Sequence, residues 1–171
     1  MDPTTVSNSV DAPPERVYEA VCDLGLRPLF ADHFQKDFRL ARIESSGSGA
    51  AARFQVSPPG LGRLWVETVI AEAERPSRVV EHGRCGRLGR ITLVTTWEML
   101  ERDGGTDVQL TFLSRTGNPF DRAREVLGAR RWYRRKWRKA LRRLAALVEG
   151  DLPAERRVDL AGGDRASTGV F

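Results

Sequence analysis

The sequence predicts an α+β fold, in which a curved, seven-stranded antiparallel sheet wraps around one long C-terminal helix. Three observations lead to this prediction. Two short helical segments follow the first strand, six further strands succeed one another across short turns, and a long amphipathic segment comes last. Short connections make consecutive strands antiparallel neighbours, and helices gathered on one face of such a sheet are typical of the α+β class.

The first part of the chain is one strand and two short helices. Residues 4–10 alternate between apolar and polar side chains, which predicts a strand. Two prolines and an acid then favour the first turn of a helix, which is predicted over residues 16–23 and ended by Gly25. A second short helix or turn is predicted over residues 26–34.

The middle of the chain reads as a series of strands. Its β-branched and aromatic runs are separated by clusters of Gly, Pro, Ser and Asp, which favour turns. The six strands predicted in this way are residues 38–45, 51–57, 63–74, 78–84, 90–102 and 106–116.

A helix of about 30 residues, roughly 45 Å long, is predicted from Asn118 to Gly150. One apolar stripe of this helix should lie against the sheet. The stripe consists of Val126, Tyr133, Trp137, Leu141, Leu144 and Val148. Residues 1–150 are therefore predicted to form a single domain, and the polar residues 151–171 a disordered tail.

Several classes of protein are disfavoured by composition. The chain has no run of roughly 20 apolar residues, which a membrane-spanning helix needs. Its N-terminus lacks the basic start and apolar run of a secretion signal, so a cytoplasmic location is expected. The two cysteines and two histidines have no metal-ligand spacing, so neither a metal nor a cofactor is expected.

Two local motifs resemble a known superfamily. Residues 10–18 (VDAPPERVY) look like its passage from first strand to first helix, and residues 95–100 (TTWEML) with residues 104–108 (GGTDV) look like its penultimate hairpin. The order of elements and these motifs resemble the START-like superfamily, also called SRPBCC or Bet v 1-like. The likeness is to its polyketide cyclase/dehydrase and lipid-transport branch. Leu29-Phe30 stands where the family often has a tryptophan.

The resemblance implies a helix-grip fold with an internal hydrophobic cavity. Members of the superfamily bind lipids, sterols, polyketides or quinones, and some cyclise or dehydrate polyketide chains. Because one fold hosts many functions, two readings stay open. The first is a carrier or sensor of a small hydrophobic molecule, and the alternative is a metal-independent cyclase/aromatase or dehydratase acting in the same cavity.

The residues expected to line the cavity follow from strand alternation and from the helical stripe. Aromatic and aliphatic residues at such positions are also what a plain core contains. The predicted lining residues are Phe54, Val56, His82, Leu93, Thr95, Trp97, Leu110, Phe112, Arg130, Tyr133 and Trp137.

Three of these residues are candidates for catalysis. Arg130 falls within the apolar stripe, and a buried guanidinium is costly without a partner. It would bind a ligand carboxylate or enolate, pair with an inward acid such as Glu67 or Glu81, or reach solvent at the cavity mouth. In an enzyme, His82 and Tyr133 would join Arg130 around an enolate, with the histidine as general base.

The C-terminal helix is strongly basic. Residues 119–150 carry eleven Lys/Arg against three Asp/Glu, an excess of eight, so the rest of the chain has a net charge of 5 − 8 = −3. A cationic face with an interleaved tryptophan favours anionic lipid headgroups, and the residues predicted to meet them are Trp132, Lys136, Lys139 and Arg143. Nucleic acid is the less expected partner, since no nucleic-acid-binding motif accompanies the helix. A merely solvated face is the third reading.

Overall fold

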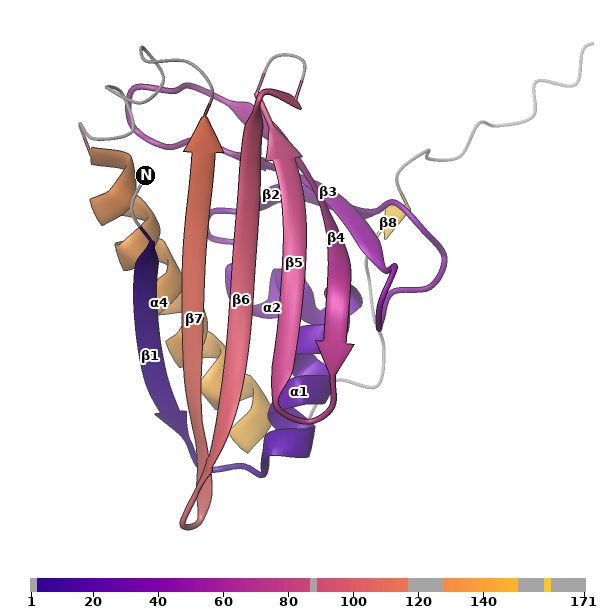
Figure 1. The fold of residues 1–171 in the computed structure, drawn as a ribbon, viewed down its shortest axis with the longest axis vertical. Coiled ribbons are helices and arrows are strands. Elements are labelled where there is room, and N and C mark those ends of the chain that lie inside the picture. Colours follow the sequence, from indigo (N-terminus) through magenta and orange to yellow (C-terminus); the bar gives the residue numbers. More distant parts are fainter. Residues whose placement is uncertain (1–2, 87–88, 117–127, 151–158, 161–171) are drawn as a thin grey trace, which may run out of the picture.

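The computed structural model of the protein describes residues 3–86, 89–116, 128–150 and 159–160 (Figure 1). It confirms the predicted α+β fold. In chain order the elements are β1 (Thr4–Val10), α1 (Pro14–Cys22), η1 (Leu24–Leu26), α2 (Arg27–Ala31), β2 (Lys36–Leu40), β3 (Ala51–Val56), β4 (Leu64–Glu74), β5 (Arg78–Cys85), β6 (Ile91–Arg102), β7 (Gly105–Thr116), α4 (Arg130–Glu149) and β8 (Asp159–Leu160).

The strands form one sheet in the order β1-β7-β6-β5-β4-β3-β2-β8. The seven predicted strands are confirmed, and every pairing among them is antiparallel. The two-residue β8 adds an eighth strand, parallel to β2. Residues 151–158 and 161–171 lie outside the described residues, so the predicted disordered tail stays a prediction.

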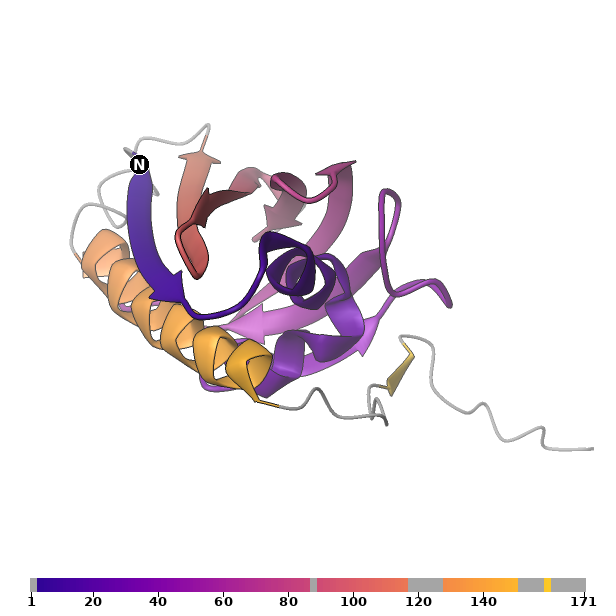
Figure 2. The same ribbon diagram turned by 90° about the horizontal axis from the view of Figure 1, so that it is seen from below.

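The sheet curves around a layer of helices (Figure 2). In this view α4 runs along one side of the curve and lies beside β1, while α1 and α2 fill the rest of its concave side. The helices therefore lie on the inner side of the sheet, where they contact β1, β5, β6 and β7.

Local sequence explains where the first helices begin and end. Pro14 stands in the first turn of α1, where the missing N–H is not needed, and Glu15 follows it. Asp23 follows the last residue of α1, and its side chain begins the next turn, because its Oδ1 accepts a hydrogen bond from the Gly25 N–H at 2.9 Å. The predicted pair of short helices is thus confirmed, with the 3-10 turn η1 between them.

The predicted apolar stripe of α4 is buried wherever it is described. Its described members are Tyr133, Trp137, Leu141, Leu144 and Val148. Val126 and the predicted start of this helix at Asn118 lie outside the described residues. The stripe places two aromatic side chains of α4 opposite the inner face of the sheet, where β6 and β7 turn Thr95 and Phe112 inward.

Candidate functional site

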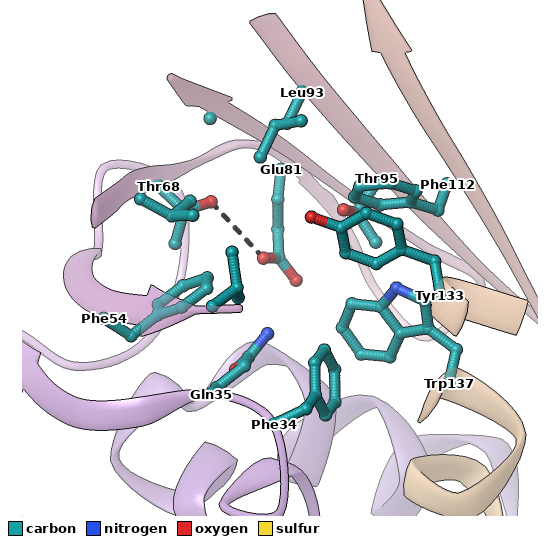
Figure 3. A pocket seen from close by; sticks show the side chains of 13 residues that line it. Phe34, Gln35, Phe54, Thr68, Glu81, Leu93, Thr95, Phe112, Tyr133 and Trp137 are labelled. Carbon is teal, nitrogen blue, oxygen red and sulfur yellow. Dashed lines mark hydrogen bonds between the residues drawn. The ribbon is translucent and has the colours of Figure 1, made fainter. Parts of the chain in front are cut away.

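A small internal cavity lies between the inner face of the sheet and α4 (Figure 3). The space open to the centre of a water molecule is about 20 Å³, which is room for about one water. Strands β3 to β7, the turn after α2, and α4 all contribute to its wall. The lining residues are Phe34, Gln35, Phe54, Val56, Val66, Thr68, Glu81, Gly83, Leu93, Thr95, Phe112, Tyr133 and Trp137.

Aromatic side chains close the helical side of the cavity. Trp137 meets Phe34 edge to face, with ring centroids 5.0 Å apart. Tyr133 lies beside Phe112, with centroids 4.4 Å apart. Such contacts are favourable beyond their burial of apolar surface, so the closed cavity is stabilised by side chains from α4, β7 and the turn after α2.

A buried ion pair forms the polar end of the cavity. Arg27, the first residue of α2, places its Nη2 2.6 Å from Oε1 of Glu81 on β5, and the two side chains are only 2% and 4% exposed. The indole Nε1 of Trp97 donates to the same Oε1 at 2.7 Å. The guanidinium carbon also lies 5.1 Å from the Trp97 ring centroid. Both charges are therefore compensated within the core, as a buried pair requires.

The second carboxylate oxygen of Glu81 accepts weaker hydrogen bonds than the first. Among the described residues, its Oε2 receives two long contacts, from Arg27 Nη1 at 3.4 Å and from Thr68 Oγ1 at 3.5 Å, near the outer limit for a hydrogen bond. Figure 3 shows the carboxylate projecting into the middle of the lining residues, with its bond to Thr68 dashed. Glu81 thus has acceptor capacity left on the cavity side.

Two further polar atoms in the lining have no hydrogen-bond partner among the described residues. They are Nε1 of Trp137 and Oε1 of Gln35, on side chains that are 3% and 4% exposed. In Figure 3 the nitrogen of Trp137 lies on the edge of its ring that faces Tyr133, and the Gln35 amide has its nitrogen, not its oxygen, nearer to Glu81. A buried donor or acceptor without a partner is unfavourable, so these atoms indicate where a polar group of a bound molecule would lie.

Most of the predicted lining residues are where the sequence placed them. Seven of them line the cavity: Phe54, Val56, Leu93, Thr95, Phe112, Tyr133 and Trp137. Trp97 and Leu110 also point inward, but they pair with each other on a rung beyond the Thr95–Phe112 pair. Both are fully buried in packed core. Strand alternation therefore predicted correctly that they face inward, but it did not predict how far along the strands the cavity extends.

The structure corrects the expected position of His82. Along β5, Glu81 and Gly83 face inward, so His82 between them faces outward and is exposed. It lies in a separate, open hollow of about 640 Å³ on the outer face of the sheet, with Arg53 and Glu67 among its neighbours. The strand was predicted correctly, but the face assigned to this histidine was the wrong one.

The structure also corrects the expected position of Arg130. This residue is the first of α4, one turn before Tyr133, and its side chain is exposed. The spacing of the apolar stripe predicted on which side of the helix Arg130 lies. It did not predict whether the hydrophobic core extends as far as the first turn of the helix. The inward acid proposed as its partner, Glu81, pairs with Arg27 instead, and the other, Glu67, is exposed.

The main residues that sequence reasoning missed as members of the site are Arg27 and Gln35. A signal for Arg27 was present, because it interrupts an apolar stretch between Leu24 and Phe30. A charged residue in such a stretch needs a buried partner. Glu81 was recognised as an inward acid, but its partner was not identified, since the two residues are 54 positions apart in the chain.

The outer face of α4 differs from the predicted lipid-binding set. Trp132 is half-buried and packs against Phe34 and Tyr133, with the Lys136 ammonium 5.6 Å from its ring centroid. Burial, reinforced by neighbouring cations, lowers the pKa of Lys136. Arg143 is half-buried and pairs with Asp32. Of the four predicted residues, only Lys139 is exposed.

Four exposed arginines of α4 form an adjacent stripe. This arginine stripe consists of Arg131, Arg135, Arg138 and Arg142, all exposed and spaced three or four residues apart. Positions with this spacing share one face of a helix. Their separation along the axis from first to last is about 16 Å.

Other kinds of site have little support in the described part of the chain. There, His, Cys, Asp and Glu side chains nowhere gather in threes that could hold a metal ion. Among the same residues, no helix has the length and apolar run that a membrane crossing requires.

Comparison with known proteins agrees with this architecture. The model of a family described as polyketide cyclase/dehydrase and lipid transport matches residues 1–149. Protein CV1439 from Chromobacterium violaceum is similar in structure, with 19% identity, a TM-score of 0.64, and coverage of 88% of this chain and 100% of that chain. TTHA0849 from Thermus thermophilus has 23% identity and a TM-score of 0.62, with coverage of 85% and 96%.

A third similar structure is that of Ara h 8.0201, with 12% identity, a TM-score of 0.60, and coverage of 85% of this chain and 96% of that chain. At these identities the likeness to solved structures shows the fold alone. No functionally curated protein matches the sequence.

Proposed function

The chain belongs to the polyketide cyclase/dehydrase and lipid transport family of the START-like (SRPBCC, Bet v 1-like) superfamily, and we propose that it binds a small hydrophobic molecule between its sheet and α4. One observation carries this proposal. The cavity there has mainly apolar and aromatic walls and a few convergent polar groups at one end, which is the usual make-up of a small-molecule site.

The proposal requires the cavity to widen. Its present space of about 20 Å³ is far below the roughly 300–1,000 Å³ of typical ligand sites. The strands are tied by continuous ladders of hydrogen bonds, whereas Phe34, Tyr133 and Trp137 contribute side chains from the helical layer. We therefore expect the space to widen by movement of the helical layer rather than by separation of strands.

Catalysis is the alternative use of the same cavity. Of the three residues expected to act on an enolate, Tyr133 lines the cavity, while His82 and Arg130 lie outside it. Glu81 is the other titratable group in the wall, but its charge is taken up by Arg27. This favours a carrier or sensor, from which the ligand leaves unchanged, over a cyclase or dehydratase.

Native mass spectrometry of freshly purified protein tests the proposal. An extra mass that is released on denaturation would establish a bound molecule and identify its class. The variant Leu93→Trp should abolish this mass, because Leu93 lines the cavity. Val94→Trp is the matched control, since Val94 is the next residue of β6 and faces outward.

Two outcomes would contradict the proposal. One is a clean apo mass together with no binding to a panel of lipids, quinones and polyketide mimics. The other is a bound mass that Leu93→Trp retains and Val94→Trp loses. A ligand whose mass changes during incubation with the protein would instead establish the enzyme alternative.

A second function is favoured by the arginine stripe on α4. We propose that this stripe adsorbs to anionic membranes, where each basic residue near the surface contributes about 1 kcal/mol. Within residues 130–148 there is no acid to offset it. Trp132 does not belong to the adsorbing set, because it is half-buried against Phe34.

Sedimentation with phosphatidylglycerol vesicles tests this second function. Binding should fall steeply with salt and be lost when Arg131, Arg135, Arg138 and Arg142 are all changed to Gln. The control replaces four exposed arginines of other surfaces, Arg39, Arg53, Arg63 and Arg84, and should retain binding. Equal loss in both variants would mean a non-specific charge effect, and binding to nucleic acid alone would replace the membrane as partner.

We also propose residence in the cytoplasm. Its support is that Cys22 and Cys85 are both buried thiols rather than a disulfide, as in most proteins of reducing compartments. Cell fractionation with a tagged full-length chain tests this, and recovery outside the cytoplasm would contradict it.

A further inference from the structure

The polar groups in the cavity wall indicate which polar headgroup a hydrophobic ligand would carry. Trp137 Nε1 is a donor without an acceptor among the described residues, and Gln35 Oε1 is an acceptor without a donor. Glu81 Oε2 has two long contacts within the described part of the chain and lines the same cavity. The cavity wall therefore contains a donor without an acceptor and a carboxylate oxygen with spare acceptor capacity.

Few small chemical groups can both donate and accept a hydrogen bond. A hydroxyl has one donor hydrogen and two acceptor lone pairs, whereas a carbonyl only accepts and an ammonium only donates. A hydroxyl is also the size of a water molecule, which the space of about 20 Å³ already admits. It could donate toward Glu81 and accept from Trp137, because both side chains line the same small space.

Charge balance argues against an acidic ligand. The Arg27–Glu81 pair is neutral as a whole, and Arg27 Nη2 already bonds Oε1 of Glu81 at 2.6 Å. A ligand carboxylate would add a buried negative charge beside Glu81, and Arg130, the cation expected to receive it, lies outside the cavity. An uncompensated buried charge is strongly unfavourable.

We infer that the cavity selects a neutral hydrophobic molecule that bears a hydroxyl group, an alcohol, phenol or enol, over the matching carboxylate and the matching hydrocarbon. This inference rests on the proposed binding function and adds the chemistry of the headgroup. It differs from the headgroup expected from the sequence, which was a carboxylate or enolate bound by Arg130.

Isothermal titration calorimetry at pH 7 with 2-naphthol, naphthalene and 2-naphthoate tests the inference, because the three compounds share one ring system. The expected result is a dissociation constant for 2-naphthol at least about tenfold lower than for either of the others, since a hydrogen bond to a charged group is among the stronger ones. A second trio, 1-octanol, octane and octanoate, repeats the test with a flexible chain.

The variant Trp137→Phe isolates one hydrogen bond, since it keeps an aromatic ring and removes the Nε1 donor. The preference for 2-naphthol over naphthalene should shrink several-fold, whatever change the smaller ring causes in the binding of both compounds. Trp132→Phe is the matched control on the same helix and should change neither, because Trp132 does not line the cavity. Circular dichroism establishes that both variants fold, and the trios on the unaltered chain decide the inference even if one does not.

The outcomes separate the inference from the function on which it rests. If the hydrocarbon or the carboxylate binds as tightly as the alcohol, the headgroup inference is overturned and the binding function stands. If Trp137→Phe weakens 2-naphthol and naphthalene equally, Trp137 acts by shape alone, which also overturns the inference. If no member of either trio binds, the proposed function fails, and the inference fails with it.

Discussion

Two arginine–glutamate pairs of this protein have almost the same length and opposite surroundings. In the core, Arg27 and Glu81 are 2.6 Å apart, with side chains 2% and 4% exposed. At the surface, Arg75 and Glu19 are 2.7 Å apart, with side chains 60% and 55% exposed. The distance between the charges says little about what each pair contributes to stability, because water screens the second pair and not the first.

The buried pair depends on many contacts and the exposed pair on few. Trp97 donates to Glu81, and the Phe30 and Trp97 rings pack against the guanidinium of Arg27. Removing one partner in the core leaves a charge that cannot reach water, whereas removing one at the surface leaves a charge that is already hydrated. Four measurements of decreasing expected effect test this difference.

The largest effect is expected from Arg27→Met, which leaves Glu81 charged and unpaired in the core. The free energy of unfolding in urea at pH 7 should fall by about 3–5 kcal/mol. The double variant Arg27→Met/Glu81→Leu removes both charges and should be more stable than the single variant. If the double variant is less stable than Arg27→Met, the remaining charge is not the cause of the loss.

Trp97→Phe should have the next largest effect. It removes the 2.7 Å hydrogen bond from Nε1 to Glu81 while keeping an aromatic ring beside Arg27, and a bond to a charged group contributes about 1.5–3 kcal/mol. Thermal and urea unfolding should show this loss in the original chain but little of it in the Glu81→Leu background. A loss of equal size in both backgrounds would assign it to packing alone.

A half-buried group, His33, should give a smaller and pH-dependent effect. Burial lowers its pKa from 6.5, and the nearby cations Lys139, Lys136 and Arg143 lower it further, against the opposing hydrogen bond to the Lys136 carbonyl. The unfolded chain therefore takes up a proton first as the pH falls, so the folded state loses stability below about pH 6.5. Urea midpoints between pH 7.5 and 5 should fall less in His33→Asn than in the unaltered chain.

The smallest effect is expected from Glu19→Gln at the exposed pair. Double-mutant cycles of such pairs usually give about 0.2–1 kcal/mol, and 1 M salt should remove most of the difference. A cycle with Arg75→Gln measures the coupling directly. A coupling comparable to that of Arg27 and Glu81 would mean that exposure does not distinguish the two pairs.

The sequence predicted the layers of this fold well, because alternation and helical periodicity are local. The bounds of β1 were predicted as observed, and those of β3 to β7 to within a residue at each end. The inward faces of β6 and β7 were also correct. Periodicity predicts which face of a strand or helix a side chain is on, but not whether that part of the face lines the cavity, the packed core or solvent. For this reason Trp97 and Leu110 were predicted to line the cavity and Arg130 to lie in the core.

The polar end of the site could not be derived in the same way. Arg27 and Glu81 are 54 residues apart and meet only because the fold brings the first residue of α2 to the inward side chain of β5. No local pattern encodes that crossing. The misassigned face of His82 had a simpler origin, since the run Val79-Val80-Glu81-His82 has two apolar residues in succession and does not reveal which face is inward.

The tryptophans give the molecule a built-in optical probe. Trp97 and Trp137 are buried beside the cavity, with ring centroids 5.6 Å apart and planes at 90°, while Trp65 is 41% exposed and lies under the guanidinium of Arg53. Fluorescence from the buried pair should be blue-shifted and shielded from iodide, and that from Trp65 red-shifted and readily quenched. Iodide would thus quench Trp65 first, and the remaining emission, from Trp97, Trp137 and the half-buried Trp132 beside Phe34, would respond to events in the cavity, so that ligand entry can be followed without any label.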